Sequence, residues 1–103
     1  MKKMLITDDI ITDISSLLMT AADETRLKIL FALLQNKQMC VSDIQENVGA
    51  SQSLVSHQLQ VLRKKKLVAT LRDGNKIYYS LDDDHVYKLI KVAYEHVMED
   101  KDE

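Results

Sequence analysis

The chain has 103 residues, two glycines, no proline, one cysteine and a formal net charge of −2. This length allows one domain with a modest core and excludes two, and the scarcity of helix breakers favours long helices. No run of about 18 apolar residues occurs, so we expect no membrane partner. Asp8, Asp9 and Asp13 come too early for a signal peptide, and a single cysteine, Cys40, excludes an internal disulfide, so a cytoplasmic protein is expected.

Two N-terminal stretches carry apolar residues at helical spacing, and each follows a residue that can cap a helix. Thr7 or Asp8 would cap the first helix, expected over residues 8–20. Asp23 would cap the second helix. The apolar positions that define them are Ile10, Ile11, Ile14, Leu17 and Leu18, then Leu27, Leu30, Phe31 and Leu34.

Residues 41–65 predict two further helices joined by a tight turn. Ser42-Asp43-Ile44-Gln45 has the pattern of a capping box and would open a short helix. Gly49 follows where a helix commonly ends in a left-handed residue. Ser51 can cap the next helix, which we expect to run to about Lys65. Together they predict a helix-turn-helix.

A hairpin and a last helix complete the chain. The runs LVATLR and KIYYSL flank Asp73-Gly74-Asn75, a strong hairpin signal, and predict a wing over residues 67–81. Asp83 or Asp84 would cap the final helix, expected over 83–99. This helix and the first one, over 8–20, are predicted to be the dimerisation helices. The predicted fold is mainly α with a small β-hairpin, in the order α-α-α-α-β-β-α: a single winged helix-turn-helix domain over residues 1–103.

The helix after Ser51 has a polar face suited to reading DNA. On a helical wheel, polar side chains of residues 52–66 occupy an arc of about 140°, with apolar side chains on most of the remainder. Gln can bond adenine through two hydrogen bonds, Ser reaches several base edges, and cations hold phosphates. The alternative is an ordinary amphipathic helix with a hydrated face. The DNA contacts predicted here are Gln52, Ser53, Ser56, His57, Gln60, Arg63 and Lys64.

Basic residues also flank the predicted turn of the wing. Arg72 and Lys76 are expected to contact phosphates or the minor groove, although two solubilising charges on an edge hairpin are an alternative. From Ser51 to Lys76, Asp73 is the single acid among clustered cations. Clustered positive charge, rather than the mean charge, is the electrostatic signature of a phosphate-binding face.

Several of these segments resemble the ArsR/SmtB family of metal-sensing winged-helix repressors, from about Ile10 to Glu99. They are DETRLKIL, VSDIQENVGASQSLVSHQLQVLRKKKLV, RDGNKIYYSL and the terminal Asp-x-His and His-x-x-Glu helix. The most specific part is SQSLVSHQLQVL, which matches the family's Ser-x-x-Ser-His-x-Leu pattern at Ser53, Ser56, His57 and Leu59. The resemblance implies a homodimer that binds a palindromic DNA operator, represses its own operon and releases DNA when an inducer binds.

The last helix carries a candidate metal site in two halves. His85 and His96 are eleven residues apart, which separates them by about 20° around the helix but by a rise of about 16 Å. Glu99 lies on the same narrow strip of the helix surface as the two histidines, here called the stripe, and Asp83 precedes the helix near His85. Zinc ligands lie within about 4 Å of one another, so one chain cannot close this site. Two antiparallel last helices could, each site combining Asp83 and His85 of one chain with His96 and Glu99 of the other.

The chemistry of these four ligands suits zinc. Four N and O ligands favour tetrahedral Zn²⁺, Co²⁺ should also bind, and Cu²⁺ would compete on affinity alone. The family resemblance implies the same site, because its zinc sensors carry this pattern on the last helix. Its arsenite, cadmium or lead sensors resemble one another in a Cys-x-Cys that here reads Cys40-Val41-Ser42. A thiolate site is therefore not expected, and Cys40 is interpreted as a small buried apolar residue.

The hypothesis is a zinc-responsive repressor whose metal-free dimer binds its operator and whose DNA affinity falls when zinc binds. The resemblance suggests that metal efflux or detoxification genes are derepressed. One alternative is a repressor of the same family that answers to another signal, with Asp83 a simple cap and His96–Glu99 a surface pair. A metallohydrolase is disfavoured because the ligand set leaves no open position. We expect no catalytic residue and no small organic substrate.

Overall fold

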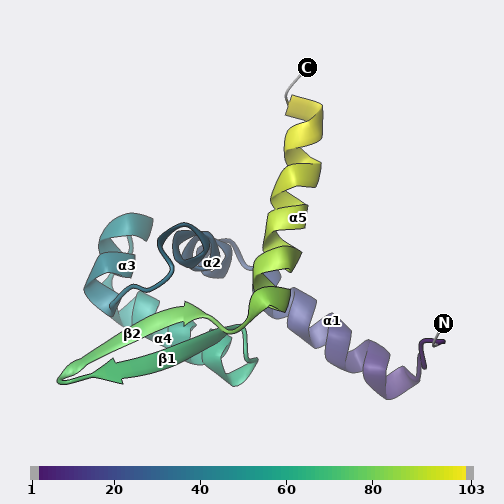
Figure 1. Ribbon diagram of the computed structural model, residues 1–103, viewed down its shortest axis with the longest axis horizontal. Coiled ribbons are helices and arrows are strands. Elements are labelled where there is room, and N and C mark those ends of the chain that lie inside the picture. The colour runs from purple at the N-terminus through teal and green to yellow at the C-terminus, as the bar shows by residue number, and fades with distance from the viewer. Residues whose placement is uncertain (1–2, 102–103) are drawn as a thin grey trace.

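The computed structural model describes residues 3–101, so residues 1–2 and 102–103 of the expected domain lie outside the described part. It contains five helices and a two-stranded antiparallel hairpin, in the predicted order. The elements are α1 (Asp8–Ala22), α2 (Glu24–Asn36), α3 (Val41–Val48), α4 (Gln52–Lys64), β1 (Val68–Asp73), β2 (Lys76–Leu81) and α5 (Asp84–Lys101). The predicted winged helix-turn-helix is confirmed. Figure 1 shows α1 and α5 leaving a body formed by α2, α3, α4 and the hairpin.

Local sequence signals fix most helix ends. The side chains of Thr7, Asp23 and Ser51 accept hydrogen bonds from backbone amides three residues ahead, at 3.2, 3.1 and 3.2 Å. Each therefore satisfies one of the amides that a helix start leaves without a partner. Gly49 ends α3 in the left-handed region, with φ +70°, and its amide donates to the Gln45 carbonyl. These caps agree with the sequence expectation.

The predicted capping box at Ser42 is wrong. Helix α3 begins at Val41, and its N-cap is Cys40, whose side chain makes no capping hydrogen bond. The cause is a contact that is distant in sequence: Met39 and Tyr79 exchange backbone hydrogen bonds of 3.0 and 2.8 Å. This pairing holds the chain extended up to the start of α3, so Ser42 already lies inside the helix.

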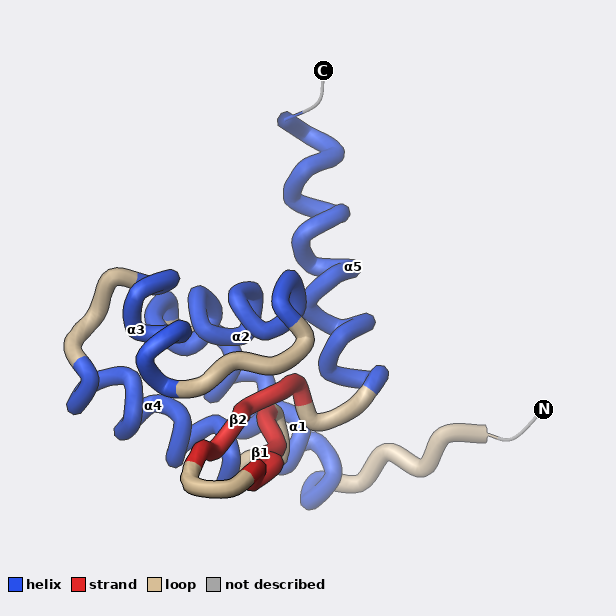
Figure 2. Tube along the Cα trace, turned by 60° about the vertical axis from the view of Figure 1, so that its left-hand side comes forward, coloured by secondary structure: helices blue, strands red, loops and turns tan. Residues whose placement is uncertain are grey.

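The hairpin turns through Gly74 and Asn75, because Asp73 pairs with Lys76. Gly74 has φ +65°, a conformation that side chains with a Cβ rarely adopt. The hairpin is joined to the end of α4 through buried Leu67, whose carbonyl accepts a 3.0 Å hydrogen bond from Asp82. Figure 2 shows the strands, in red, beside the helical body and α5 pointing away from them.

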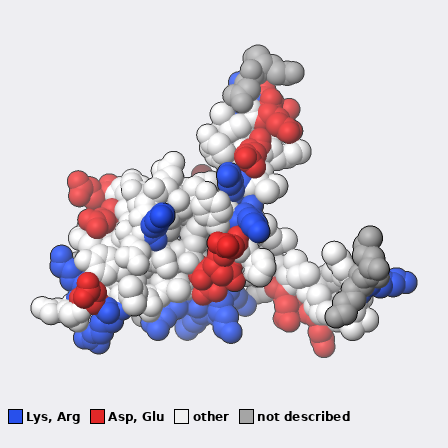
Figure 3. Space-filling view, viewed as in Figure 1, with Lys and Arg blue, Asp and Glu red and all other residues white. Residues whose placement is uncertain are grey.

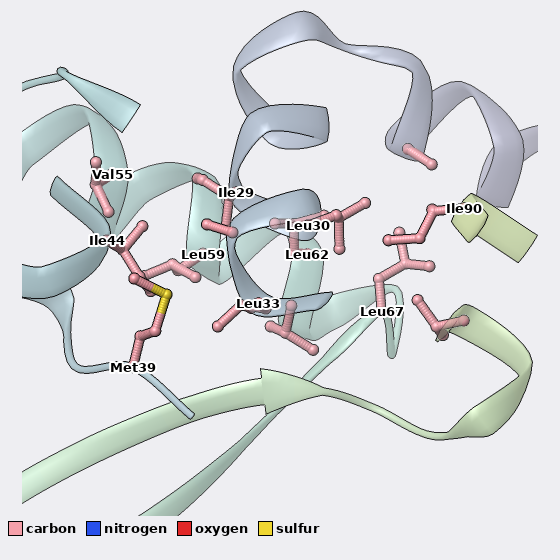
Figure 4. Close-up of a cluster of buried hydrophobic side chains, with 14 residues drawn as sticks. Ile29, Leu30, Leu33, Met39, Ile44, Val55, Leu59, Leu62, Leu67 and Ile90 are labelled. Atoms are coloured by element: carbon pink, nitrogen blue, oxygen red, sulfur yellow. The ribbon is translucent and has the colours of Figure 1, made fainter. Parts of the chain in front are cut away.

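The core lies between α2, α4 and the base of the hairpin. Figure 4 shows Ile29, Leu30 and Leu33 of α2 near Leu59 and Leu62 of α4. Helix α5 contributes buried side chains only from its first two turns, at Val86 and Ile90. The rest of α5 and the outer face of α1 expose apolar side chains to solvent. None of the helices, within residues 3–101, is long and apolar enough to span a membrane.

Candidate nucleic-acid interface and metal centre

The core fixes which face of α4 is available to a partner. Val55, Leu59 and Leu62 are fully buried, so the opposite side of the helix lies at the surface. Of the predicted contacts on α4, only Ser56 is half-buried. The exposed ones are Gln52, Ser53, His57, Gln60, Arg63 and Lys64. Leu54, which the helical wheel places on the apolar arc, is instead 40% exposed.

Sequence reasoning missed the role of Gln58. Its side chain is half-buried, and its Oε1 accepts a 2.8 Å hydrogen bond from an Nη1 of Arg26 in α2. The sequence does hold a signal for such a contact, because the side-chain amide of a glutamine on the apolar side of a helix needs a buried or half-buried polar partner. The identity of that partner was not available, since Arg26 lies 32 residues away in the sequence.

The wing presents the two predicted cations to solvent. Arg72 and Lys76 are both exposed, and Arg72 Nε donates a long 3.4 Å hydrogen bond to the Gly74 carbonyl. In Figure 3, Lys and Arg side chains gather along the lower edge of the molecule, beneath α4 and the strands. This concentration of positive charge beside the polar face of α4 suits a polyanion such as the DNA backbone.

The first half of the candidate metal site lies at the start of α5. Asp83 Oδ1 accepts hydrogen bonds from the amides of His85 and Val86, at 3.0 and 3.2 Å, so it caps the helix. Its other oxygen, Oδ2, lies 3.3 Å from His85 Nδ1, and the His85 side chain is 93% exposed. The Val86 amide first, and then the interactions with His85, lower the pKa of Asp83 from 3.8.

The second half lies near the other end of α5. His96 Nδ1 and Glu99 Oε2 are 3.7 Å apart, and the two side chains are 84% and 75% exposed. The two halves do not meet within the chain. Across residues 3–101, no three His, Cys, Asp or Glu side chains come close enough to hold a metal ion together. Each half therefore offers one carboxylate and one imidazole and is incomplete by itself.

The apolar surface beside this stripe differs from the expectation in part. Val86 and Ile90 lie beside the stripe on a helical wheel, where apolar side chains are expected to hold a second copy of the helix, but they are buried in the chain's own core. They face inward because the first turns of α5 close over α2 and the base of the hairpin. Leu89 and Val97 stay exposed, and Val92, 60% exposed, joins them.

The interpretation of Cys40 as a buried apolar residue is also wrong. Its side chain is half-exposed, and its Sγ lies 3.2 Å from both Ser42 Oγ and Asp43 Oδ2. Its N-cap position explains this, because a cap residue sits beside the first-turn side chains rather than in the core.

Comparison with known proteins identifies the class of molecule. Residues 23–70 match the family model "Bacterial regulatory protein, arsR family". The transcriptional repressor SmtB homolog of Synechocystis is 41% identical over 78 residues, which are 76% of this chain and 58% of that protein. The cadmium resistance transcriptional regulatory protein CadC homolog of Staphylococcus aureus is 32% identical over 87 residues, which are 84% of this chain and 72% of that protein.

Solved structures extend the likeness over most of the chain. The antimony-specific transcriptional repressor AntR gives a TM-score of 0.85 at 29% identity, covering 99% of this chain and 92% of that one. A homodimeric winged helix-turn-helix DNA-binding domain of Mycobacterium bovis, Mb0332, gives 0.77 at 27% identity, covering 91% and 93%. These relatives are regulators and not enzymes. Because most of the chain matches such proteins in both sequence and structure, the chain belongs to the arsR family of bacterial regulatory proteins.

Proposed function

We propose that the chain is a homodimeric, cytoplasmic DNA-binding repressor that responds to zinc held between the last helices of its two subunits. The observation that carries this proposal is the pair of exposed carboxylate–imidazole half-sites at opposite ends of α5. Membership of the arsR family supports the regulatory role. The related proteins carry names that point to cadmium and antimony, so the metal preference proposed for this chain rests on the chain's own ligands.

The exposed face of α4 is the surface proposed to contact DNA bases. Its glutamine side-chain amides and serine hydroxyls would contact base edges. Phosphates would be held by Arg63 and Lys64 of the same helix and by Arg72 and Lys76 of the wing. In a dimer, two such helices about 34 Å apart would meet successive major grooves of a palindromic operator. The half-buried Ser56 would reach a base only at close approach.

The ligand chemistry favours zinc over a softer ion. Each half-site offers one oxygen and one nitrogen, the donors that Zn²⁺ accepts readily, and Co²⁺ would be a spectroscopic substitute. Soft ions such as Cd²⁺ favour thiolates, and the chain has a single cysteine, Cys40, on α3. Asp83 and His85 from one subunit would join the partner's His96 and the partner's Glu99, twice per dimer.

Residues of the first half-site are already arranged for binding. Two backbone amides hold Asp83 Oδ1, and Oδ2 lies 3.3 Å from His85 Nδ1, so the two atoms that would bind one zinc ion already lie side by side. A bound zinc ion would cross-link the two subunits. DNA release then requires that the dimer binds zinc more tightly when free than when bound to DNA. His96 is the natural transmitter, because its second ring nitrogen can donate a hydrogen bond towards the DNA-binding body.

Zinc binding and DNA binding can be measured on the same variants. Equilibrium dialysis of the wild type should give about one zinc ion per chain, and His96→Ala should lose affinity by about 10- to 100-fold or more. His57→Ala is the matched control, because His57 is an exposed histidine on α4, away from the stripe. It should keep the zinc affinity of the wild type.

The response of DNA binding to zinc tests the regulatory half. Fluorescence anisotropy would use a palindromic duplex selected from random sequence with the wild-type dimer. Zinc should weaken binding of the wild type and have no effect on His96→Ala. Equal DNA affinity with and without zinc would favour the alternative, a repressor that responds to another signal. Tight zinc binding that survives His96→Ala would remove the proposed site.

A further inference from the structure

Arg26 connects three helices through one side chain. Its Nε donates a 2.7 Å hydrogen bond to the Thr20 carbonyl in α1, and its Nη1 donates a 2.8 Å bond to Gln58 Oε1 in α4. Its own amide donates to the Asp23 cap of α2. No ion pair within residues 3–101 involves Arg26, so these neutral acceptors are its specific polar partners.

The two acceptors explain why an arginine stands here. Thr20 is buried in the last turn of α1, where a helix leaves carbonyls without an internal partner, and the guanidinium supplies one. A positive charge at that end also suits the helix dipole. Because the guanidinium is planar, its two donors point in fixed directions, so the positions of Thr20 and Gln58 are fixed relative to each other. A lysine ammonium lacks this fork.

Gln58 cannot belong to the face of α4 that is proposed to read DNA. On the helical wheel it lies about 170° from the centre of the polar arc, and its side chain is half-buried against the body. The hydrogen bond from Arg26 therefore reaches the side of α4 that is opposite to the proposed DNA-contacting face. The same Arg26 side chain also bonds α1, whose outer face exposes Ile10, Ile14 and Leu18.

We propose that Arg26 is a positioning residue that sets the angle of α4 relative to α1, and thereby the separation of the two reading helices in the dimer. The proposal rests on the proposed function, in which α4 contacts DNA, and on the exposed apolar face of α1 forming part of the dimer interface. If α1 is fixed against the second subunit, a link from α1 to the back of α4 determines where each reading helix lies relative to the two-fold axis. Arg26 then determines which spacing between operator half-sites fits best.

The test measures spacing preference rather than affinity alone. The probes are the duplex selected by the wild type, the same duplex with one base pair added or removed at its centre, and a single half-site. Gln58→Ala removes the acceptor, whereas Gln58→Glu keeps an oxygen at the same place and is the matched control. Arg26→Lys keeps the charge but loses the fork, and guards against an unexpected effect of alanine on α4.

The expected result is a change in discrimination. The ratio of Kd values between altered and selected spacings should fall by about fivefold in Gln58→Ala and Arg26→Lys, the equilibrium factor associated with one hydrogen bond. Binding to the single half-site should stay unchanged, and Gln58→Glu should keep the wild-type ratio. A role confined to stability would lower the melting temperature and leave the ratio unchanged, and that outcome would overturn the proposal. A wild type that selects no duplex would instead overturn the proposed function and this inference together.

Discussion

Asp83 has two structural roles that depend on its being charged. One carboxylate oxygen accepts the amides of His85 and Val86, and the other contacts the His85 ring. The Val86 amide is the largest cause of the lowered pKa of Asp83. Because the pKa in the folded chain is below 3.8, the unfolded chain takes up the proton at higher pH than the folded chain. The carboxylate therefore stabilises the fold above pH 3.8, and this contribution is lost as the pH falls through the folded-state pKa.

Asp83→Asn should isolate this effect, because asparagine can still cap a helix but does not titrate. In metal-free protein, we expect the wild type to exceed the variant in free energy of unfolding at pH 7. The difference should shrink towards zero below pH 3.8. Urea unfolding at pH 7, 5, 4 and 3, with chelator and at constant chain concentration, measures it. Asp84→Asn controls for loss of a neighbouring charge. A difference that stays constant over this range would contradict the role given to the Val86 and His85 contacts.

At the scale of the element, the starts of α3 and α4 separate local signals from distant ones. Both helices were predicted to begin with a capping serine. Ser51 does cap α4, because nothing outside the turn competes with it. Ser42 does not cap α3, because the pairing of Met39 with Tyr79 sets where the extended chain ends. A capping pattern is visible in the sequence, but a backbone pairing forty residues apart is not.

Alanine substitutions should reproduce this difference. Ser51→Ala should cost about 1 kcal/mol of unfolding free energy, because the Leu54 amide loses its acceptor. Ser42→Ala should cost much less, since Ser42 satisfies no amide at the start of α3. Urea unfolding of both variants at equal chain concentration decides this. Equal losses would mean that Ser42 caps α3 after all.

In the candidate site, too, features that depend on nearby residues could be predicted and features that depend on distant contacts could not. The polar arc of α4 and the contact of Asp83 with His85 come from residues within a few turns of one another, so spacing alone could predict them. The contact of Arg26 with Gln58 joins two helices, and the inward turn of Val86 and Ile90 depends on the packing of α5 against the body. The place of Gln58 on the apolar side of α4 indicates that it needs a polar partner, but no local signal identifies Arg26 or predicts that Val86 and Ile90 turn inward. Helical rise alone predicted that His85 and His96 could not share a metal ion within one chain.

At the scale of the whole molecule, α1 and α5 extend from the body with apolar side chains facing solvent (Figure 1). Such surfaces are expected where subunits associate. On α5 the exposed Val92 lies between Glu99 and His85 around the helix, at intervals of about 20°. Subunit contact and metal binding would therefore use the same strip of α5. A change that separates the subunits should also abolish zinc binding, since neither half-site is complete alone.

Val92→Glu tests this link against a matched substitution in the wing. Val92 is 60% exposed and Leu71, near the wing tip, is 55% exposed, so the two sites differ in place rather than in burial. Burying two unpaired carboxylates at an interface costs several kcal/mol, so Val92→Glu should sediment as a monomer and lose zinc binding. Leu71→Glu should stay dimeric, keep zinc affinity and weaken only DNA binding, because it adds negative charge next to Arg72. If Val92→Glu stayed dimeric while Leu71→Glu dissociated, the subunits would meet through the wing. The two ends of α5 could then not complete each other's ligand sets.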